Sequence, residues 1–410
     1  MSFVAEFNRL PHADLLARAR SASRLDVETS LTRLRPGLID FAHLISPAAA
    51  ACLESMGRAA HALTQQRFGR VIRLFAPLYL SNECINRCRY CGFSRNHPIR
   101  RVTLSIAEVT AEARALRAQG FRNLLLVAGE HPRLVSTRYL ERCVAAVHAE
   151  VPGISLEIGP LKAEAYQPLV QAGAEGLVVY QETYDRGVYA EVHGPGPKRD
   201  FEWRLETPER AYAAGFRRLG IGALLGLADW RSEAIALAAH AVYLLRHCWQ
   251  ASLTVSVPRL RPCAGAFQPP AVMGDRDLVQ LVCALRIFLP DVGLVLSTRE
   301  PARLRDGLIP LGITLISAGS HTEPGGYTGA GHNALRGTEP GCGVMLGAPD
   351  CLWTGAERQA TPQFQVADNR SPAQVSQRLR QLGYEPVWKD WDTALTGAPC
   401  SPSDTSTSPP

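Results

Sequence analysis

The stretch VIRLFAPLYLSNECINRCRYCGF, residues 71–93, joins an apolar run to three closely spaced cysteines. Apolar and β-branched residues dominate 71–80, a composition typical of a buried strand. Cys84, Cys88 and Cys91 follow with C-x3-C-x2-C spacing. Thiolates are soft ligands that select iron–sulfur clusters, zinc or copper(I), and three protein ligands leave one coordination position open. The stretch therefore predicts a strand that leads into a reactive metal centre.

Two less reactive metal sites stay open as alternatives. His97, six residues after Cys91, is a possible fourth ligand of a structural zinc ion, although such sites usually join two ligand pairs across a longer loop. An electron-transfer iron–sulfur centre would use a fourth cysteine close by. The next cysteine, Cys143, lies 52 residues further on within a helical pattern.

Residues 71–320 alternate short apolar runs with helical segments eight times, which predicts a parallel sheet with crossover helices. Eight such units in this length match a (β/α)8 TIM-type barrel, whose typical length is about 250 residues. A doubly wound open sheet is the alternative. The expected strands are 71–80, 123–129, 154–159, 176–182, 217–224, 251–257, 293–298 and 312–318.

Extensions flank the predicted barrel on both sides. Residues 1–70 have a helical pattern and are expected to cover the base of the barrel. Residues 321–395 form a C-terminal extension, within which the glycine-rich segment 325–363 is expected to be a long loop or partly disordered insert. The low-complexity tail 396–410 is expected to be disordered.

Two capping boxes predict where helices begin. Ser105 is followed three residues later by Glu108, and Ser371 in the same way by Gln374.

Composition excludes several classes of protein. With 410 residues, 46% hydrophobic and 20% charged, the chain can bury a large core. Eleven unevenly spaced cysteines do not resemble the disulfide framework of a small secreted domain, so a reducing, cytoplasmic location is expected. No apolar run reaches the length of a membrane helix. The net charge of +6 comes without a basic, aromatic-rich run, so neither a membrane nor a nucleic acid is expected as partner.

The cysteine loop and several later segments together resemble the radical S-adenosylmethionine (SAM) aromatic amino-acid lyases, and most of all the tyrosine lyases of thiamine thiazole biosynthesis. Each segment is short, but their order and spacing along the chain make the resemblance specific. The segments after the loop are LLLVAGEH (124–131), VVYQETY (178–184), DFEWRLETPERA (200–211), GIGALLGL (220–227), SVPRLRPC (256–263), LSTRE (296–300), ISAGS (316–320) and PVWKDWD (386–392).

The resemblance implies two cofactors, a [4Fe-4S] cluster and SAM. Cys84, Cys88 and Cys91 would bind three irons, and the fourth iron would bind SAM, whose reductive cleavage gives a 5'-deoxyadenosyl radical. A structural ion pair is the competing interpretation for Glu130, which lies at the end of a strand, and for the combination of Glu182 with Arg204. The implied SAM-binding residues are Tyr90, Gly129, Glu130, Glu182 and Arg204.

An amino-acid substrate needs a fixed cation for its carboxylate, and Arg299, with Ser297 and Ser317 nearby, resembles the carboxylate clamp of these lyases. The implied reaction cleaves the Cα–Cβ bond of L-tyrosine to 2-iminoacetate (dehydroglycine) and p-cresol. The implied partners are a thiazole synthase protein and an electron donor such as flavodoxin or ferredoxin.

Three other functions remain as alternatives. A hydrogenase-maturation tyrosine lyase of the same family carries a second, C-terminal cluster, whose usual C-x2-C pair is absent here: only Cys342, Cys351 and Cys400 occur in that region. A tryptophan lyase is the second alternative. A metal-bound scaffold without enzymatic activity is the third.

Overall fold

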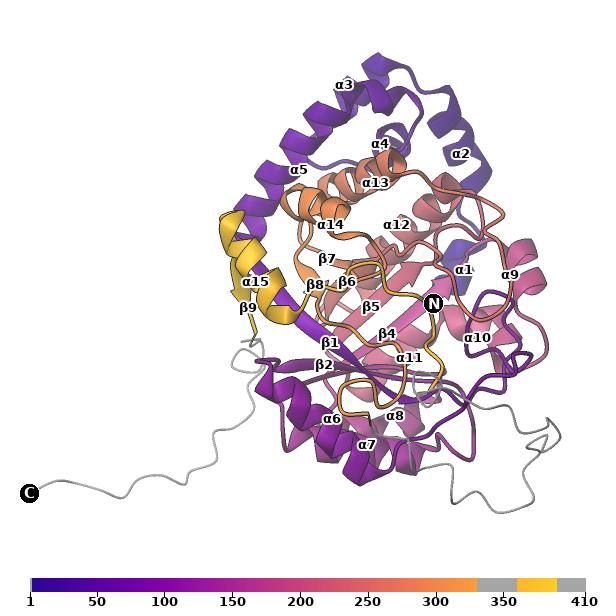
Figure 1. The fold of residues 1–410 in the computed structure, drawn as a ribbon. Coiled ribbons are helices and arrows are strands. Elements are labelled where there is room, and N and C mark those ends of the chain that lie inside the picture. Colours follow the sequence, from indigo (N-terminus) through magenta and orange to yellow (C-terminus); the bar gives the residue numbers. More distant parts are fainter. Residues whose placement is uncertain (1, 330–359, 389–410) are drawn as a thin grey trace, which may run out of the picture.

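In the computed structural model, which describes residues 2–329 and 360–388, eight parallel strands close into a barrel (Figure 1). The first strand pairs with both the second and the eighth, which closes the sheet. The predicted (β/α)8 barrel is therefore confirmed and the open sheet is excluded. The barrel strands are β1 (Val71–Ser81), β2 (Asn123–Ala128), β3 (Gly153–Glu157), β4 (Gly176–Glu182), β5 (Arg218–Ala223), β6 (Ser252–Ser256), β7 (Gly293–Leu296) and β8 (Leu315–Ser317).

The predicted strand positions agree closely with the structure, except that β8 begins three residues later than expected from its apolar run (312–318). A 3-10 turn, Ile309–Leu311, precedes it, and Gly312 has a positive φ of 149° that few other residues adopt. The chain therefore still turns where the apolar pattern already suggests a strand.

Helices surround the barrel and form the N-terminal part of the chain (Figure 1). They are α1 (Phe3–Phe7), α2 (His12–Ser21), α3 (Arg24–Leu31), α4 (Leu38–Leu44), α5 (Leu53–Phe68), α6 (Ile106–Ala118), α7 (Thr137–His148), α8 (Ala163–Gln171), α9 (Arg186–Val192), α10 (Phe201–Leu205), α11 (Thr207–Ala214), α12 (Trp230–His247), α13 (Asp275–Phe288), α14 (Ala302–Leu308) and α15 (Pro372–Gln381), with 3-10 turns at Ala48–Cys52, Pro197–Arg199 and Ile309–Leu311.

Both predicted capping boxes are present. The Ser105 hydroxyl accepts from the backbone of Glu108 at the start of α6, and Ser371 and Gln374 do the same at α15. Each reciprocal cap satisfies two backbone donors that the helix itself leaves unpaired, so these short motifs fix where the helices begin.

The N-terminal helices pack on the side of the barrel, so their predicted place at its base is wrong. Helices α1, α2, α4 and α5 contact α12 and α13. The amide of Gln280 in α13 donates to the carbonyls of Leu44 (3.0 Å) and Ser46 (2.8 Å). Residues 234–239 of α12 are all buried, and a helix that is apolar all round needs cover on its outer face as well.

The C-terminal segment returns to the first strand. Strand β9 (Glu385–Val387) follows α15 and pairs in parallel with the start of β1. Trp388 packs edge-on against Phe121, with ring centroids 5.1 Å apart. Residues 330–359 of the predicted insert, the last part of PVWKDWD and the tail 396–410 lie outside the described residues. The domain boundaries stay predictions.

Within residues 2–329 and 360–388, none of the helices combines the length and the apolar character that crossing a membrane requires.

Candidate active site

The loop after β1 is held to the barrel end by Asn82 and Arg101. The buried Asn82 amide donates to the carbonyl of Arg100 (2.8 Å) and accepts from the backbone of Val102 (2.6 Å). The Arg101 guanidinium donates to the carbonyls of Asn82 (2.8 Å) and Ser94 (2.7 Å). The loop that carries the cysteines therefore has a fixed path although it contains little regular structure.

The three predicted ligands all lie in this loop. Cys88 is buried, and Cys84 and Cys91 are half-buried. Burial raises the pKa of Cys88 to about 12 and that of Cys91 to about 11, and each pKa is raised further by neighbouring thiols of the same set. Amide groups contact two of the sulfurs: Asn86 Nδ2 lies 3.7 Å from Cys84 Sγ, and Gln363 Nε2 lies 3.9 Å from Cys91 Sγ. Thiolates here would require a nearby positive charge, which iron supplies.

Within the described part of the chain, no three His, Cys, Asp or Glu side chains are grouped as a single metal ion would require. A four-iron cluster binds its three thiolates through three different irons, so its ligands need not converge on one point. His97, the alternative zinc ligand, packs its ring against Gly265. Cys263 lies near the loop and donates from its thiol to the carbonyl of Tyr90 (3.3 Å).

Gly129, a predicted SAM contact at the end of β2, lies directly against the cysteine loop. Its amide donates to Ser81 O (2.9 Å), and a Cβ at this position would lie 2.2 Å from the carbonyl oxygen of Glu83. Only glycine permits this approach of two backbones.

We predict that Gly129→Ala displaces the cysteine loop and reduces bound iron to well below one cluster per chain. The substitution should also cost about 1–3 kcal/mol of folding free energy through overpacking. Iron and sulfide analysis after reconstitution, with thermal unfolding, measures both effects. Gly307→Ala is the matched control, since a Cβ there meets nothing within 4 Å. Equal iron content in the two variants would contradict this role of Gly129.

Glu130, the next predicted SAM contact, is connected to the cysteine loop through Asn86. Asn86 Nδ2 donates to Glu130 Oε2 (2.7 Å), while Asn86 Oδ1 accepts from the backbone of Lys198 (2.9 Å). Gly159 leaves room for the carboxylate, because a Cβ there would lie 2.7 Å from Glu130 Cδ. One amide thus connects the loops after β1, β2 and β4.

Glu182 ends β4 in a strained conformation and forms two ion pairs. Its φ of +73° is the only positive value of a non-glycine residue among those described, and such conformations cost of order 1–3 kcal/mol and cluster at functional sites. Its carboxylate lies 2.6 Å from Lys198 Nζ and 3.4 Å from Arg204. Burial alone would raise the pKa of Glu182, but these two cations lower it below its usual value. The predicted pair of Glu182 and Arg204 is therefore close in space, together with a lysine that was not predicted.

Tyr90, in the aromatic position before the last cysteine, has its hydroxyl 2.7 Å from His193 Nε2. Lys198 Nζ lies 5.6 Å from the centre of the Tyr90 ring. Burial and the Lys198 charge lower the pKa of His193 to about 3, so this imidazole is neutral and its second nitrogen hydrogen-bonds the carbonyl of Tyr189. Through these hydrogen bonds the neutral side chain of His193 connects Tyr90 of the cysteine loop to the carbonyl of Tyr189.

The predicted substrate residues meet after β7 and β8. The Ser297 hydroxyl accepts from the backbone of Arg299 (3.3 Å), and the Ser317 hydroxyl accepts from the backbone of Thr298 (3.1 Å). The Arg299 guanidinium lies over the ring of Phe364 at 3.4 Å. None of residues 2–329 and 360–388 offers it an acceptor within hydrogen-bonding distance. The two serine hydroxyls thus accept from the backbone of Thr298 and Arg299, and the guanidinium stacks on Phe364.

Glu157 ends β3 on the barrel's interior face. Side chains alternate along a strand, and Ser155, two residues earlier, lines the interior. Burial and the neighbouring Glu182 raise the pKa of Glu157 to about 7, against the opposing effects of Arg299, Lys198 and Arg204. No hydrogen bond to its carboxylate occurs within the described residues. The Glu157 carboxylate and the Arg299 cation are thus near enough to interact electrostatically.

Sequence analysis missed Asn86, Glu157, Lys198 and Gln363. Glu157 falls near the end of an expected strand, 154–159, and catalytic residues of such barrels lie at strand C-terminal ends, so its position was a usable signal. Asn86 lies between two predicted ligands, and its amide was a usable signal. Lys198 and Gln363 come from irregular segments far along the chain, which carry no periodic signal.

The barrel and the cysteine loop after its first strand define a radical SAM enzyme. The family model of the radical SAM superfamily matches residues 78–238, and that of the biotin and thiamin synthesis associated domain matches residues 256–385. The 2-iminoacetate synthase of Escherichia coli (strain K12) is 40% identical over 395 residues, covering 96% of this chain and 98% of that protein. The chain belongs to the 2-iminoacetate synthase family of radical SAM enzymes.

Solved structures agree with this fold. The FeFe-hydrogenase maturase HydG from Carboxydothermus hydrogenoformans is 35% identical with a TM-score of 0.75, covering 95% of this chain and 82% of that one. Methylornithine synthase (PylB) has a TM-score of 0.65 at 20% identity, covering 88% and 97% of the two chains, which supports the fold alone.

Members of the radical SAM superfamily use a [4Fe-4S] cluster and SAM, and the residues present fit both groups. Three thiols of a buried loop match the soft ligands that an iron–sulfur cluster takes. The carboxylates of Glu130 and Glu182 at the ends of β2 and β4, and the guanidinium of Arg204 in α10, match the ammonium, hydroxyl and carboxylate groups of SAM. The zinc-site and scaffold alternatives are therefore not supported.

Proposed function

We propose that this protein cleaves the Cα–Cβ bond of L-tyrosine, giving 2-iminoacetate and p-cresol while SAM is converted to methionine and 5'-deoxyadenosine. The observation that carries the proposal is the 40% identity to 2-iminoacetate synthase over nearly its whole length, which includes the cysteine loop and the strand-end residues.

In this proposal Cys84, Cys88 and Cys91 bind the cluster. When bound, the cluster and SAM supply the one-electron cleavage that begins hydrogen-atom abstraction from the substrate. The residues proposed to position SAM come from the ends of β2 and β4, from the cysteine loop and from α10. They are Tyr90, Gly129, Glu130, Glu182 and Arg204.

Arg299 is proposed to bind the carboxylate of the amino acid, with Ser297 and Ser317 holding its backbone in place. A guanidinium fork matches a carboxylate bidentately, and stacking on Phe364 fixes its plane. We assign Glu157 to the ammonium group of the same substrate, because a zwitterion is recognised best by one cation and one anion in a shared chamber. Together these two residues would orient the Cα–Cβ bond toward SAM.

The Glu157 assignment predicts a pH dependence that Glu157→Gln removes. With a pKa of about 7, the carboxyl is mostly ionised at about pH 8 and mostly neutral at about pH 6. Affinity for tyrosine should therefore fall about tenfold as the pH is lowered from about 8 to about 6, because only the ionised Glu157 carboxylate attracts the ammonium group of the substrate. KM measured across this range tests the prediction. An identical pH profile in wild type and Glu157→Gln would contradict it.

The deciding experiment for the reaction itself is anaerobic. The protein is reconstituted with iron and sulfide, supplied with SAM, reductant and tyrosine, and 5'-deoxyadenosine and p-cresol are quantified. Formation of both in step supports the tyrosine lyase. 5'-Deoxyadenosine without p-cresol would leave a radical SAM enzyme with another substrate, and tryptophan offered in parallel tests the tryptophan lyase directly.

A hydrogenase-maturation role is the second candidate, because HydG structures share this fold, one of them with a TM-score of 0.81 at 30% identity. The cysteines that a second cluster would need, Cys342, Cys351 and Cys400, lie outside the described residues. Iron content separates the two roles: Cys84→Ala should lose all iron in a single-cluster protein and keep part of it in a two-cluster protein.

The proposal extends to the pathway. 2-Iminoacetate would be consumed by a thiazole synthase protein for the thiazole of thiamine, and flavodoxin or ferredoxin would supply the electron. Family resemblance supports both partners. Co-elution with purified thiazole synthase in size-exclusion chromatography tests the first of them, and absence of co-elution at micromolar concentrations would count against a stable complex.

A further inference from the structure

Residues 361–365, from the end of the glycine-rich segment, pack against the cysteine loop. The backbone N–H of Thr361 donates to the carbonyl of Arg100 (3.3 Å), and its carbonyl accepts from the side-chain amide of Asn82 (3.2 Å). Two residues further on, the backbone N–H of Gln363 donates to the carbonyl of Thr322 (2.8 Å). The backbone of Gln363 therefore has a fixed place beside the loop that carries the predicted ligands.

The closest approach of the two segments is at Gly92, the residue after Cys91. A Cβ at Gly92 would lie 2.4 Å from the carbonyl oxygen of Gln363 and 3.0 Å from that of Pro362. Two backbones come this close only where one residue has no side chain. This approach brings the side chain of Gln363 to the thiol of Cys91, with Nε2 hydrogen-bonded to Sγ at 3.9 Å.

The other end of the Gln363 amide is held by Tyr79. The hydroxyl of Tyr79 donates to Gln363 Oε1 (2.7 Å). Tyr79 is buried, and its ring meets that of Phe93 edge-on with centroids 5.9 Å apart. An amide has an acceptor side and a donor side, so a hydroxyl bound to the oxygen directs the NH2 group toward Cys91.

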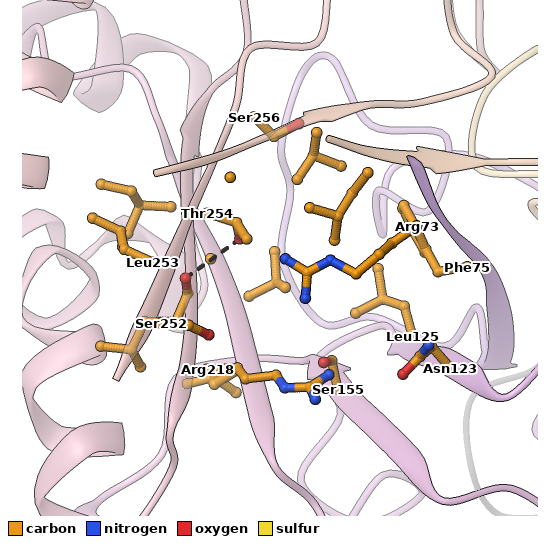
Figure 2. A pocket seen from close by; sticks show the side chains of 18 of the residues that line it. Arg73, Phe75, Asn123, Leu125, Ser155, Arg218, Ser252, Leu253, Thr254 and Ser256 are labelled. Carbon is orange, nitrogen blue, oxygen red and sulfur yellow. Dashed lines mark hydrogen bonds between the residues drawn. The ribbon is translucent and has the colours of Figure 1, made fainter. Parts of the chain in front are cut away.

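Strand β1 places Tyr79 on the interior face of the barrel. Phe75, four residues earlier, lines a cavity at the opposite end of the barrel interior, and Figure 2 shows its side chain among those around that cavity. Side chains alternate along a strand, so Tyr79 and Phe75 share one face. The Gln363 amide is therefore supported by a barrel strand as well as by loops, and groups held by strands are positioned more precisely.

The donor side of this amide suits a metal-bound thiolate, which has no proton and can only accept. Hydrogen bonds to the sulfurs are among the factors that set the reduction potential of an iron–sulfur cluster. One-electron reduction adds a negative charge to the cluster, and an N–H dipole aimed at a ligand thiolate stabilises the more negative state more strongly. Such a donor should therefore raise the reduction potential.

We propose that Gln363 is a positioning residue of the cluster, whose amide, oriented by Tyr79, donates to the Cys91 thiolate and raises the reduction potential of the bound cluster. Gln363 acts through Cys91 and itself binds neither iron nor substrate. Its effect is to ease the transfer of one electron from the flavodoxin or ferredoxin. This role rests on the proposed function, in which Cys91 is a ligand.

The test is a redox titration of the full-length, reconstituted protein, followed by electron paramagnetic resonance in the absence of SAM and tyrosine. Gln363→Met keeps the length of the side chain and removes the amide donor. The equilibrium constant for reduction of the cluster should fall about three- to tenfold, which is about 28–59 mV for a one-electron couple. A midpoint potential equal to that of wild type, at equal iron content, would overturn the proposal.

Two further variants assign the effect to the oriented amide. Tyr79→Phe keeps the amide but removes the hydroxyl that orients it, so the potential should also fall, by less than in Gln363→Met. If Gln363→Met does not assemble a cluster, a wild-type potential in Tyr79→Phe overturns the proposal instead. Gln365→Met is the matched control, because Gln365 is exposed in the same segment and its replacement should leave the potential unchanged. An equal fall in Gln365→Met would refute a specific role of the Gln363 amide.

Iron analysis of Cys91→Ala separates this role from the assignment of the ligands. Loss of the cluster in Cys91→Ala, together with a wild-type potential in Gln363→Met, would refute the role of Gln363 and leave the ligand assignment intact. A complete cluster in Cys91→Ala would exclude Cys91 as a ligand, and the role of Gln363 with it.

Discussion

Cys88→Ala is expected to lose the iron–sulfur cluster and, with it, all formation of 5'-deoxyadenosine from SAM. Cys88 is 4% exposed, and its backbone forms an antiparallel bridge with His193, so the thiol has a fixed position. In the proposed assignment each of three irons would take one thiolate from this loop, and the substitution would leave one iron without a protein ligand. Iron and sulfide per chain, together with chromatographic detection of 5'-deoxyadenosine, measure the effect.

Cys143→Ala is the matched control for this prediction. Cys143 is buried in α7, away from the loop, so its loss should affect packing and leave iron content and SAM cleavage close to wild type. Retained SAM cleavage in Cys88→Ala would refute the ligand assignment, and loss of iron in both variants would point to general instability of the fold.

The barrel could be predicted because its strands are continuous apolar runs separated by helical patterns. Strand β1 illustrates this: the expected 71–80 differs from Val71–Ser81 by one residue. A strand buried on both faces carries its signal locally, and eight such signals in order leave few possible topologies. The three predicted cysteine ligands also lie within one short segment, and their role as ligands stays a prediction.

Contacts between distant segments were not predictable. Lys198 reaches Glu182 from a 3-10 turn, and its charge offsets the cost of burying that carboxylate. Phe364 reaches Arg299 from beyond the glycine-rich segment. Neither side chain lies in a periodic pattern, and only the closed barrel brings them to the same end. The N-terminal helices were misplaced for a related reason: the need of α12 for an outer cover depends on tertiary packing.

At Glu182 the backbone adopts a conformation that a non-glycine residue does not favour by itself. The register of β4 against β5 shifts between Tyr180 and Glu182, and a non-glycine residue accepts a positive φ there. Two cations hold its carboxylate in place, so their attraction compensates for the strained backbone. No sequence rule places a glutamate in that conformation, whereas its location at a strand end was predictable.

Arg299→Ala is expected to weaken tyrosine binding by about 2–5 kcal/mol, the usual cost of truncating one partner of a buried charge pair. This corresponds to a roughly 30- to 5,000-fold rise in the dissociation constant. The physical reason is that the guanidinium stacks on Phe364 at 3.4 Å and has no acceptor among residues 2–329 and 360–388, so a substrate carboxylate would be its first partner. The KM for tyrosine and the kcat/KM of p-cresol formation measure the loss.

Arg299→Lys and Arg303→Ala separate charge, geometry and nonspecific effects. The lysine keeps the charge but cannot bind a carboxylate bidentately or stack in the same plane, so its KM should fall between wild type and Arg299→Ala. Arg303 is exposed on α14, four residues further along, and its removal should change KM little. SAM cleavage without tyrosine should persist in all three variants, which shows that the cluster loop is intact. An unchanged KM in Arg299→Ala would exclude this residue from the substrate site. Another nearby cation would then have to bind the substrate carboxylate, and Lys198 and Arg204 would be tested next.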